Sequence, residues 1–128
     1  GLSALTVDEN LMQAAQIRAE EMAATTTYSH TRPDGTKYST VTGCRYVAEN
    51  INRIAQLYLD QRSKSLAEAT VDSWAYSDGH LANMLSTKAN AIGVGIAKGV
   101  NDNGKDAWYC VQEFLYKGYT ITQVYTLK

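Results

Sequence analysis

The two histidines are the side chains best suited to chemistry near neutral pH. An imidazole can accept a proton or bind a metal ion, and the chain contains only His30 and His80. His30 precedes the turn signal Arg32-Pro33-Asp34-Gly35, and His80 follows Asp78, which is expected to cap a short helix. Because the N-terminus of a helix disfavours positive charge, we expect His80 to be neutral. Both positions favour display at the surface over burial in a core.

A third residue, Glu49, could join the histidines in a metal site. His30, Glu49 and His80 would form a His₂Glu set, in which zinc activates a water molecule and Glu49 takes its proton. The spacing matches no short metal-ligand signature, and the chain has no Gly-x-Ser-x-Gly elbow or recognisable catalytic cysteine. From spacing alone, surface histidines that only form hydrogen bonds are the more ordinary interpretation.

Three other reactive or ionisable residues allow two interpretations each. Glu113 lies on an expected central strand, where it faces either solvent, which we favour, or the same site as Glu49. Cys44 and Cys110 either form a disulfide, closing a loop of about 66 residues, or remain buried thiols. A disulfide would agree with an exported protein.

Composition limits the classes of function. The 128 residues fit a single domain, and a net charge of −1 without a basic run argues against nucleic acid as a partner. No apolar stretch approaches the roughly 20 residues that cross a bilayer. The chain starts with Gly1, so we expect a processed protein whose export signal has been removed. Nine Tyr against one Phe indicate either an aromatic groove or tyrosines decorating a sheet.

Helical signals dominate the first two thirds of the chain. A capping box at residues 6–9 predicts a helix start, followed by an apolar stripe and an end near residues 25–27. Residues 48–51 are expected to be a short segment that leads into a weak helix through Leu59. A second capping box at 65–68 predicts a helix whose apolar face carries Val71, Trp74 and Ala75, and Asp78 caps a helix over 80–85. The stripe of the first helix consists of Leu11, Ala15, Ala19 and Met22.

Strand signals follow. Residues 92–96 and 107–115 flank the hairpin loop 101–104, and a last strand is expected over 119–127, with Ile121, Gln123, Tyr125 and Leu127 on one face. Helices followed by an antiparallel meander are typical of an α+β domain.

Several short segments, in this order, resemble the CAP superfamily of cysteine-rich secretory, antigen 5 and pathogenesis-related 1 proteins, and especially its bacterial SCP-like extracellular branch. They are Tyr28-Ser29-His30 with the turn after it, Ala48-Glu49-Asn50-Ile51, Trp74, Ser77-Asp78-Gly79-His80, Asn83-Met84-Leu85, Ile92-Gly93-Val94-Gly95 and the strand around Trp108.

The resemblance implies a fold and a site. The fold would be an α-β-α sandwich with a three-stranded antiparallel sheet between helical layers, in one CAP domain over 1–128 that lacks the family's first helix. The site would be a surface cleft with His30, Glu49 and His80, and with Ser77 where eukaryotic members often carry a second acidic residue. In family members the histidine pair can hold a divalent ion, usually zinc, which here would bind His30 and His80.

The resemblance also sets the expected function. We expect a secreted or cell-surface protein whose cleft binds a divalent metal and an extracellular ligand such as a lipid, peptide or glycan, without turnover. One alternative is a zinc-assisted hydrolase with Glu49 as general base. The other is a structural or adhesive surface protein.

Overall fold

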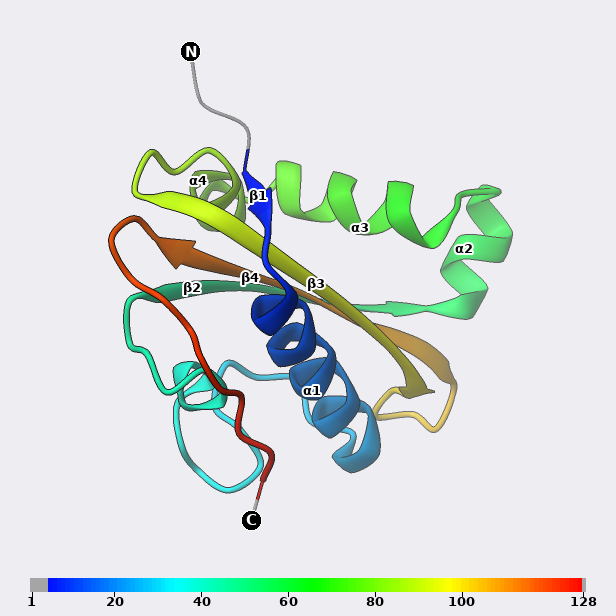
Figure 1. Ribbon diagram of the computed structural model, residues 1–128. Coiled ribbons are helices and arrows are strands. Elements are labelled where there is room, and N and C mark those ends of the chain that lie inside the picture. The colour runs from blue at the N-terminus through cyan, green and yellow to red at the C-terminus, as the bar shows by residue number, and fades with distance from the viewer. Residues whose placement is uncertain (1–4, 128) are drawn as a thin grey trace.

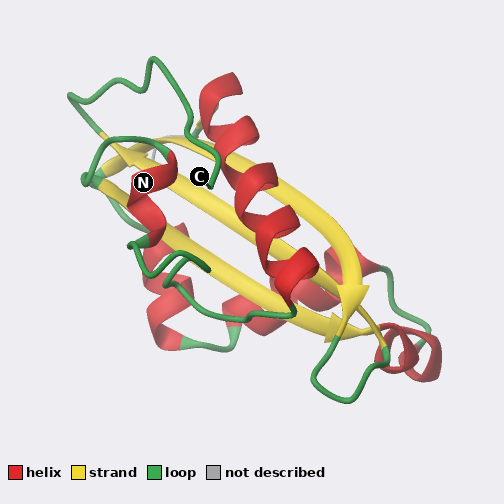
Figure 2. Cartoon of the chain, turned by 90° about the horizontal axis from the view of Figure 1, so that it is seen from below, coloured by secondary structure: helices red, strands yellow, loops and turns green. Residues whose placement is uncertain are grey.

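The computed structural model describes residues 5–127 and shows a mixed sheet with helices on both faces (Figures 1 and 2). Helix α1 packs on one face together with the short 3-10 helix η1, and α2, α3 and α4 lie on the other. The helices are α1 (Glu9–Thr25), η1 (Tyr38–Val41), α2 (Gln56–Arg62), α3 (Leu66–Ala75) and α4 (Asp78–Met84), and the strands are β1 (Thr6–Val7), β2 (Val47–Ala55), β3 (Ala89–Val100) and β4 (Asp106–Tyr116).

The sheet has four strands in the order β1-β3-β4-β2, which corrects the expectation of three antiparallel strands. β2, β3 and β4 are antiparallel, but the two-residue β1 pairs in parallel with β3, with Thr6 opposite Ala91. Thr6 does not cap the first helix as predicted, because it lies in β1 and the helix begins only at Glu9. Asp8 is the cap instead, and its carboxylate accepts a hydrogen bond from the Leu11 amide at 2.9 Å.

Helix α1 lies directly on β3 because glycines face it. A Cβ atom on Gly93 would come within 2.1 Å of the Leu11 backbone, and one on Gly95 within 2.4 Å of the Ala15 backbone. Gln16 lies over the free edge of β3, where its amide donates to the Ile96 carbonyl and accepts from the Ile96 amide. The helix thus covers the sheet and protects its edge. The predicted stripe of Leu11, Ala15, Ala19 and Met22 is confirmed as fully buried.

Residues 47–55 form a strand, whereas the sequence predicted a short segment leading into a helix. Polar residues of β2 are buried, among them Glu49, Asn50 and Asn52, so the strand lacks the apolar alternation by which a strand is recognised. The helix that follows, α2, starts only at Gln56.

The predicted last strand over 119–127 is wrong, because the described part of this segment is irregular. Ile121 is buried against Leu11 and Val47, but Gln123 and Tyr125 are exposed, and the Tyr125 amide donates to the Val41 carbonyl. The outer edge of β3 is already occupied by β1 and α1. The outer edge of β2 is covered by side chains that bond the carbonyls of Val47, Glu49 and Ile51.

Helix α3 confirms its predicted capping box, since Ser65 and Glu68 exchange both hydrogen bonds. Its buried residues differ from the prediction: Trp74 is buried and donates to the Ile51 carbonyl at 2.9 Å, whereas Val71 and Ala75 are exposed. Helix α4 starts at Asp78, so this residue lies in the first turn instead of capping it.

Both cysteines are free thiols, so of the two alternatives drawn from the sequence the disulfide is wrong. Cys110 lies on β4 and faces α3, where the Thr70 hydroxyl contacts its sulfur at 3.5 Å. Cys44 packs with Leu11 and Val47 on the side of α1. The sheet lies between the two thiols.

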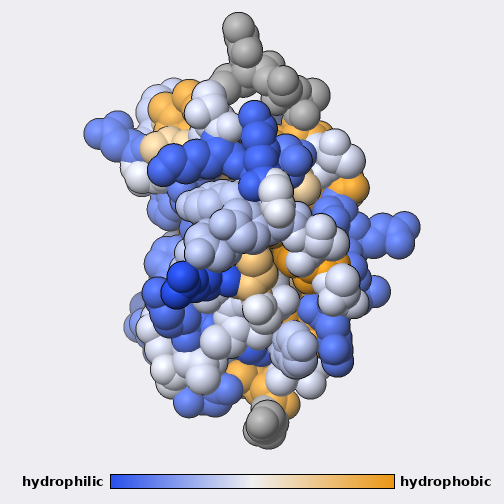
Figure 3. Space-filling view, turned by 60° about the vertical axis from the view of Figure 1, so that its left-hand side comes forward, coloured by the Kyte–Doolittle hydropathy of each residue, from blue (hydrophilic) through white to orange (hydrophobic). Residues whose placement is uncertain are grey.

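Two further observations concern the surface and the helices of the described residues. The face in Figure 3 is largely hydrophilic, with hydrophobic side chains in small separate areas. Within residues 5–127, no helix is long and apolar enough to cross a membrane.

Candidate functional site

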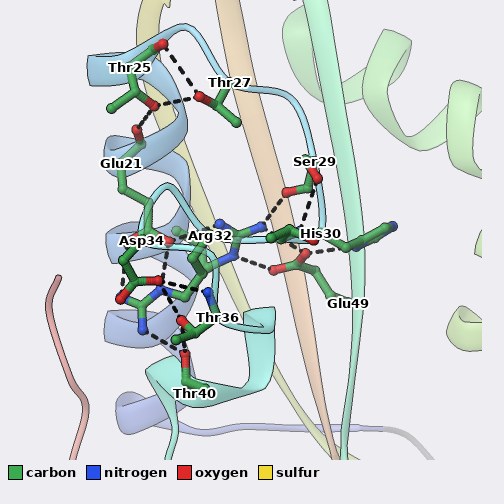
Figure 4. A network of polar contacts seen from close by, with 12 residues as sticks. Glu21, Thr25, Thr27, Ser29, His30, Arg32, Asp34, Thr36, Thr40 and Glu49 are labelled. Carbon is green, nitrogen blue, oxygen red and sulfur yellow. Dashed lines mark hydrogen bonds and ion pairs between the residues drawn. The ribbon is translucent and has the colours of Figure 1, made fainter.

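His30 lies at the outer edge of β2 and is held there by Glu49. The chain leaves α1 through Thr26, whose left-handed backbone ends the helix, and returns toward the sheet. The His30 Nδ1 atom lies 2.8 Å from Glu49 Oε1 (Figure 4). The His30 ring packs edge-on against Tyr38. About half of the His30 side chain (49%) is exposed, so the ring reaches solvent beyond the Glu49 contact.

Glu49 is the centre of a buried ionic network. Arg18, which is fully buried, donates from Nε to Glu49 Oε2 at 2.8 Å and from Nη2 to Oε1 at 3.1 Å. Burial by itself would raise the pKa of Glu49, but hydrogen bonds from His30 and Arg18 outweigh it, and the pKa lies below its ordinary value. Glu49 is therefore an ionised carboxylate that both partners hold in place.

The network continues from Arg18 into the loop that carries His30. Arg18 donates to Glu21 at 2.8 Å and to the Ser29 carbonyl at 2.7 Å. Arg32 in turn makes a bidentate pair with Glu21 at 2.9 and 3.0 Å (Figure 4). Arg32 also donates to the Tyr125 carbonyl. These contacts fix the loop after His30 against α1. From the sequence, Arg18, Glu21 and Arg32 were not expected to take part in the site.

Glu113 is fully buried, which corrects the favoured expectation that it faces solvent. It lies on β4 directly opposite Glu49 on β2, on the face covered by α1. Neither of its carboxylate oxygens has a hydrogen-bond partner among the described residues. Burial first, and then the charge of Glu49, raise the pKa of Glu113 well above its ordinary value. The two carboxyl groups thus favour opposite protonation states.

His80 approaches the same strand edge from the other face of the sheet. It lies in the first turn of α4, which is tied to β2 because the Asn50 amide donates to the His80 carbonyl at 3.1 Å. Asn83 supports this contact by donating to Asn50 Oδ1 at 2.9 Å. The sequence did not indicate that Asn50 and Asn83 connect α4 to β2, although both residues belong to the motifs quoted above.

The His80 ring is kept neutral by its surroundings. Burial first, and then the nearby charge of His30, lower the pKa of His80. The expected direction is confirmed, and burial is its largest cause. The Nδ1 atom of His80 is buried and has no hydrogen-bond partner among the described residues. Ser77 precedes α4, and its side chain makes no capping bond.

The side chains at the outer edge of β2 fit a metal site of two imidazoles better than a His₂Glu site. Within residues 5–127, no three or more His, Cys, Asp and Glu side chains are arranged to hold a metal ion. Both oxygens of Glu49 are already engaged, by Arg18 and His30. What the strand edge offers is His30, oriented by Glu49, and His80 with an unpartnered ring nitrogen.

Comparisons with known proteins agree on one family. The model of the CAP, or cysteine-rich secretory protein, family matches residues 1–114. An extracellular SCP-domain protein from Bacillus anthracis superposes with a TM-score of 0.60 at 25% identity, over 91% of this chain and 35% of that one. This chain thus spans about a third of the length of that protein. No curated protein sequence matches significantly.

Two further solved structures share the fold. An outer surface protein from Borrelia burgdorferi matches with a TM-score of 0.56 at 18% identity, over 91% of this chain and 80% of that one. The protein MpPR-1i matches with a TM-score of 0.53 at 15% identity, over 94% of this chain and 77% of that one.

Proposed function

Because the chain belongs to the CAP family, we propose that it is an extracellular binding module in which His30 and His80 hold a divalent ion and, through it, a ligand, without turnover. The extracellular and outer-surface descriptions of two structural neighbours support the location. The contact between His30 Nδ1 and the ionised Glu49 carboxylate, at 2.8 Å, carries the proposal.

That contact sets the chemical state of His30. An ionised carboxylate accepts a hydrogen bond, so Nδ1 is the ring nitrogen that donates to Glu49, and Nε2 is the ring nitrogen left to face a metal ion. A metal-binding histidine usually donates its other ring N–H to a carboxylate or carbonyl, which fixes both tautomer and orientation. Arg18 adds rigidity because it holds Glu49 from the opposite side. His80 supplies the second imidazole in its neutral form.

Two imidazoles suit zinc or a similar divalent ion and leave coordination positions open. A bound ion would supply an electrophilic anchor for an oxygen or nitrogen atom of the ligand. His30 and His80 would hold it, and Glu49 would orient His30 without touching the ion.

Zinc-assisted hydrolysis receives less support. A general base must take a proton, but hydrogen bonds lower the pKa of Glu49 and engage both of its oxygens. Catalytic zinc sites also use three protein ligands, whereas the strand edge offers two.

Calorimetric titration of metal-stripped protein with Zn²⁺ near neutral pH tests the proposal. We expect one-to-one binding that His30→Ala and His80→Ala each abolish. Glu49→Gln should weaken binding about 10- to 100-fold, because it loosens the orientation of His30. Glu20→Gln, a substitution at an exposed position on α1, is the matched control and should bind like the wild type.

Two results would overturn this function. Absence of heat with the wild type, or unchanged binding in both histidine variants, would leave the pair without a metal role and favour an adhesive protein. Turnover of a peptide or ester that depends on His30 and His80 would show a hydrolase instead.

A further inference from the structure

A groove runs along the C-terminal half of β2, on the face covered by α2 and α3. Its volume is about 520 Å³, within the range of small-ligand sites. Asn52 on β2 lines the floor of the groove. Tyr58 on α2 lines one wall, and Ser73 and Tyr76 on α3 line the other. Since none of His30, Glu49 and His80 lines it, this groove is separate from the histidine site.

Asn52 points to a ligand in the groove. The residue is only 7% exposed, and its Nδ2 donor has no hydrogen-bond partner among the described residues. Its Oδ1 atom makes one long contact, 3.5 Å from the Ser73 hydroxyl. A buried amide donor without an acceptor is destabilising, so turning the amide to donate from Nδ2 to a ligand oxygen in the groove would remove this cost.

The walls display aromatic rings. Tyr76 at the end of α3 is 91% exposed, and Tyr58 is 38% exposed, with the Arg62 guanidinium stacked 4.6 Å from its ring centre. An exposed tyrosine offers a flat apolar face and a hydrogen-bonding hydroxyl. Pyranose rings have a matching character, because a face of C–H groups lies beside a rim of hydroxyl groups.

The groove suits neither of the two other common extended ligands. A peptide that adds a strand needs a free strand edge, but next to the groove the outward carbonyl of Ile51 already accepts from Trp74. An acyl chain needs an apolar lining, but Lys64 and Asp72 form an ion pair at 2.9 Å in this groove.

We propose that the groove of Asn52, Tyr58, Ser73 and Tyr76 binds a linear oligosaccharide. Sugar rings pack on Tyr76 and Tyr58, and a hydroxyl or N-acetyl oxygen accepts from Asn52 Nδ2. The ion pair of Lys64 and Asp72 supplies further polar partners for hydroxyl groups.

Titration with two soluble tetramers, one of β-linked N-acetylglucosamine and one of β-linked glucose, tests the proposal by NMR. We expect at least one tetramer to shift the Asn52 side-chain amide signal. Tyr76→Ala should weaken that binding about tenfold or more, because it removes an exposed aromatic contact. Asn52→Leu should also weaken it, while leaving the melting temperature unchanged or higher, since the amide it replaces is unpartnered.

Two controls separate this site from the histidine site. Tyr119→Ala removes an exposed tyrosine outside the groove and should leave tetramer binding unchanged. His30→Ala should lose zinc binding but keep tetramer binding, so failure of one proposal is distinguishable from failure of the other.

The oligosaccharide assignment is wrong if neither tetramer shifts the Asn52 signal, or if Tyr76→Ala and Asn52→Leu bind like the wild type. A shift caused only by a short peptide or by a fatty-acid micelle would equally overturn it.

Discussion

At the scale of single residues, two carboxyl groups on facing strands have opposite protonation preferences because their partners differ. Glu49 receives hydrogen bonds from Arg18 and His30, which favour its ionised form. Glu113 lies opposite it without a partner among the described residues and beside the negative charge of Glu49. From α1, Arg18 favours the ionised form of Glu113 and Glu21 opposes it. The balance leaves Glu113 as the group that retains its proton.

Glu113→Gln should therefore stabilise the protein increasingly as pH rises. A carboxyl group whose folded pKa is raised binds protons more tightly in the folded state. Its contribution to stability is complete below the unfolded pKa, about 4.3 for Glu, and is lost as pH rises toward the folded value. Glutamine is nearly isosteric with glutamate and does not ionise, so the variant does not lose this stability as pH rises.

Urea unfolding of both proteins between pH 4 and pH 8 measures the effect. We expect nearly equal free energies of unfolding at pH 4 and a variant more stable by about 1 kcal/mol or more at pH 8. Glu20→Gln should show no such divergence. A Glu113→Gln variant less stable than the wild type at pH 8 would mean that the ionised carboxylate has a stabilising partner.

The sequence predicted the site's residue types better than their environments. The order of the motifs grouped His30, Glu49 and His80 in one expected site. The residue pattern of β4 could not show that Glu113 lies on the same face of the sheet as Glu49. Arg18 did carry a signal: it lies seven residues after Leu11 and four before Met22, within the buried stripe of α1. A charge in such a stripe indicates a buried ionic partner.

At the scale of elements, the position of α1 on β3 depends on the glycines of that strand. Gly95→Ala should destabilise the fold by about 3 kcal/mol, since the new methyl group would overlap the Ala15 backbone. Thermal unfolding followed by circular dichroism checks this. Because α1 carries Arg18, a displaced helix should also weaken zinc binding.

Gly79→Ala is the matched control for this substitution. Gly79 lies in α4, an added Cβ there would meet open space, and alanine favours a helix over glycine by about 0.5–1 kcal/mol. The control should therefore be slightly more stable than the wild type. Equal stability of Gly95→Ala and the wild type would show that α1 can move away from β3 at little cost.

The elements that the sequence predicted well have regular apolar patterns. Helix α1 and the hairpin of β3 and β4 are of this kind, whereas the start of α3 was recognised by its capping box. Strand β2 was missed because its buried face carries Asn50 and Asn52, whose partners come from distant segments such as α4. Segment 119–127 has strand-like alternation, but it finds both sheet edges occupied, a fact of tertiary structure that no local pattern contains.

At the scale of the whole molecule, two hydrophobic layers stabilise the sandwich without a covalent link. Apolar clusters lie on the α1 face, around Leu11 and Tyr109, and on the opposite face, around Phe114 and Ile54. A chain of 128 residues buries enough surface to fold without disulfides. The sequence left a disulfide and two free thiols as alternatives, and the positions of Cys44 and Cys110 on opposite sides of the sheet exclude the disulfide.

The two thiols should therefore differ in reactivity but not in oxidation state. Cys110 is 1% exposed and burial raises its pKa, so it forms little thiolate, whereas Cys44 is partly exposed. Iodoacetamide should label Cys44 in the native protein and Cys110 only after unfolding, as peptide mass spectrometry would show. Dithiothreitol should leave the melting temperature unchanged, because there is no cross-link to reduce. A melting temperature that falls with dithiothreitol would require a bond between the two sulfurs, and the sheet that separates them would then have to be arranged differently.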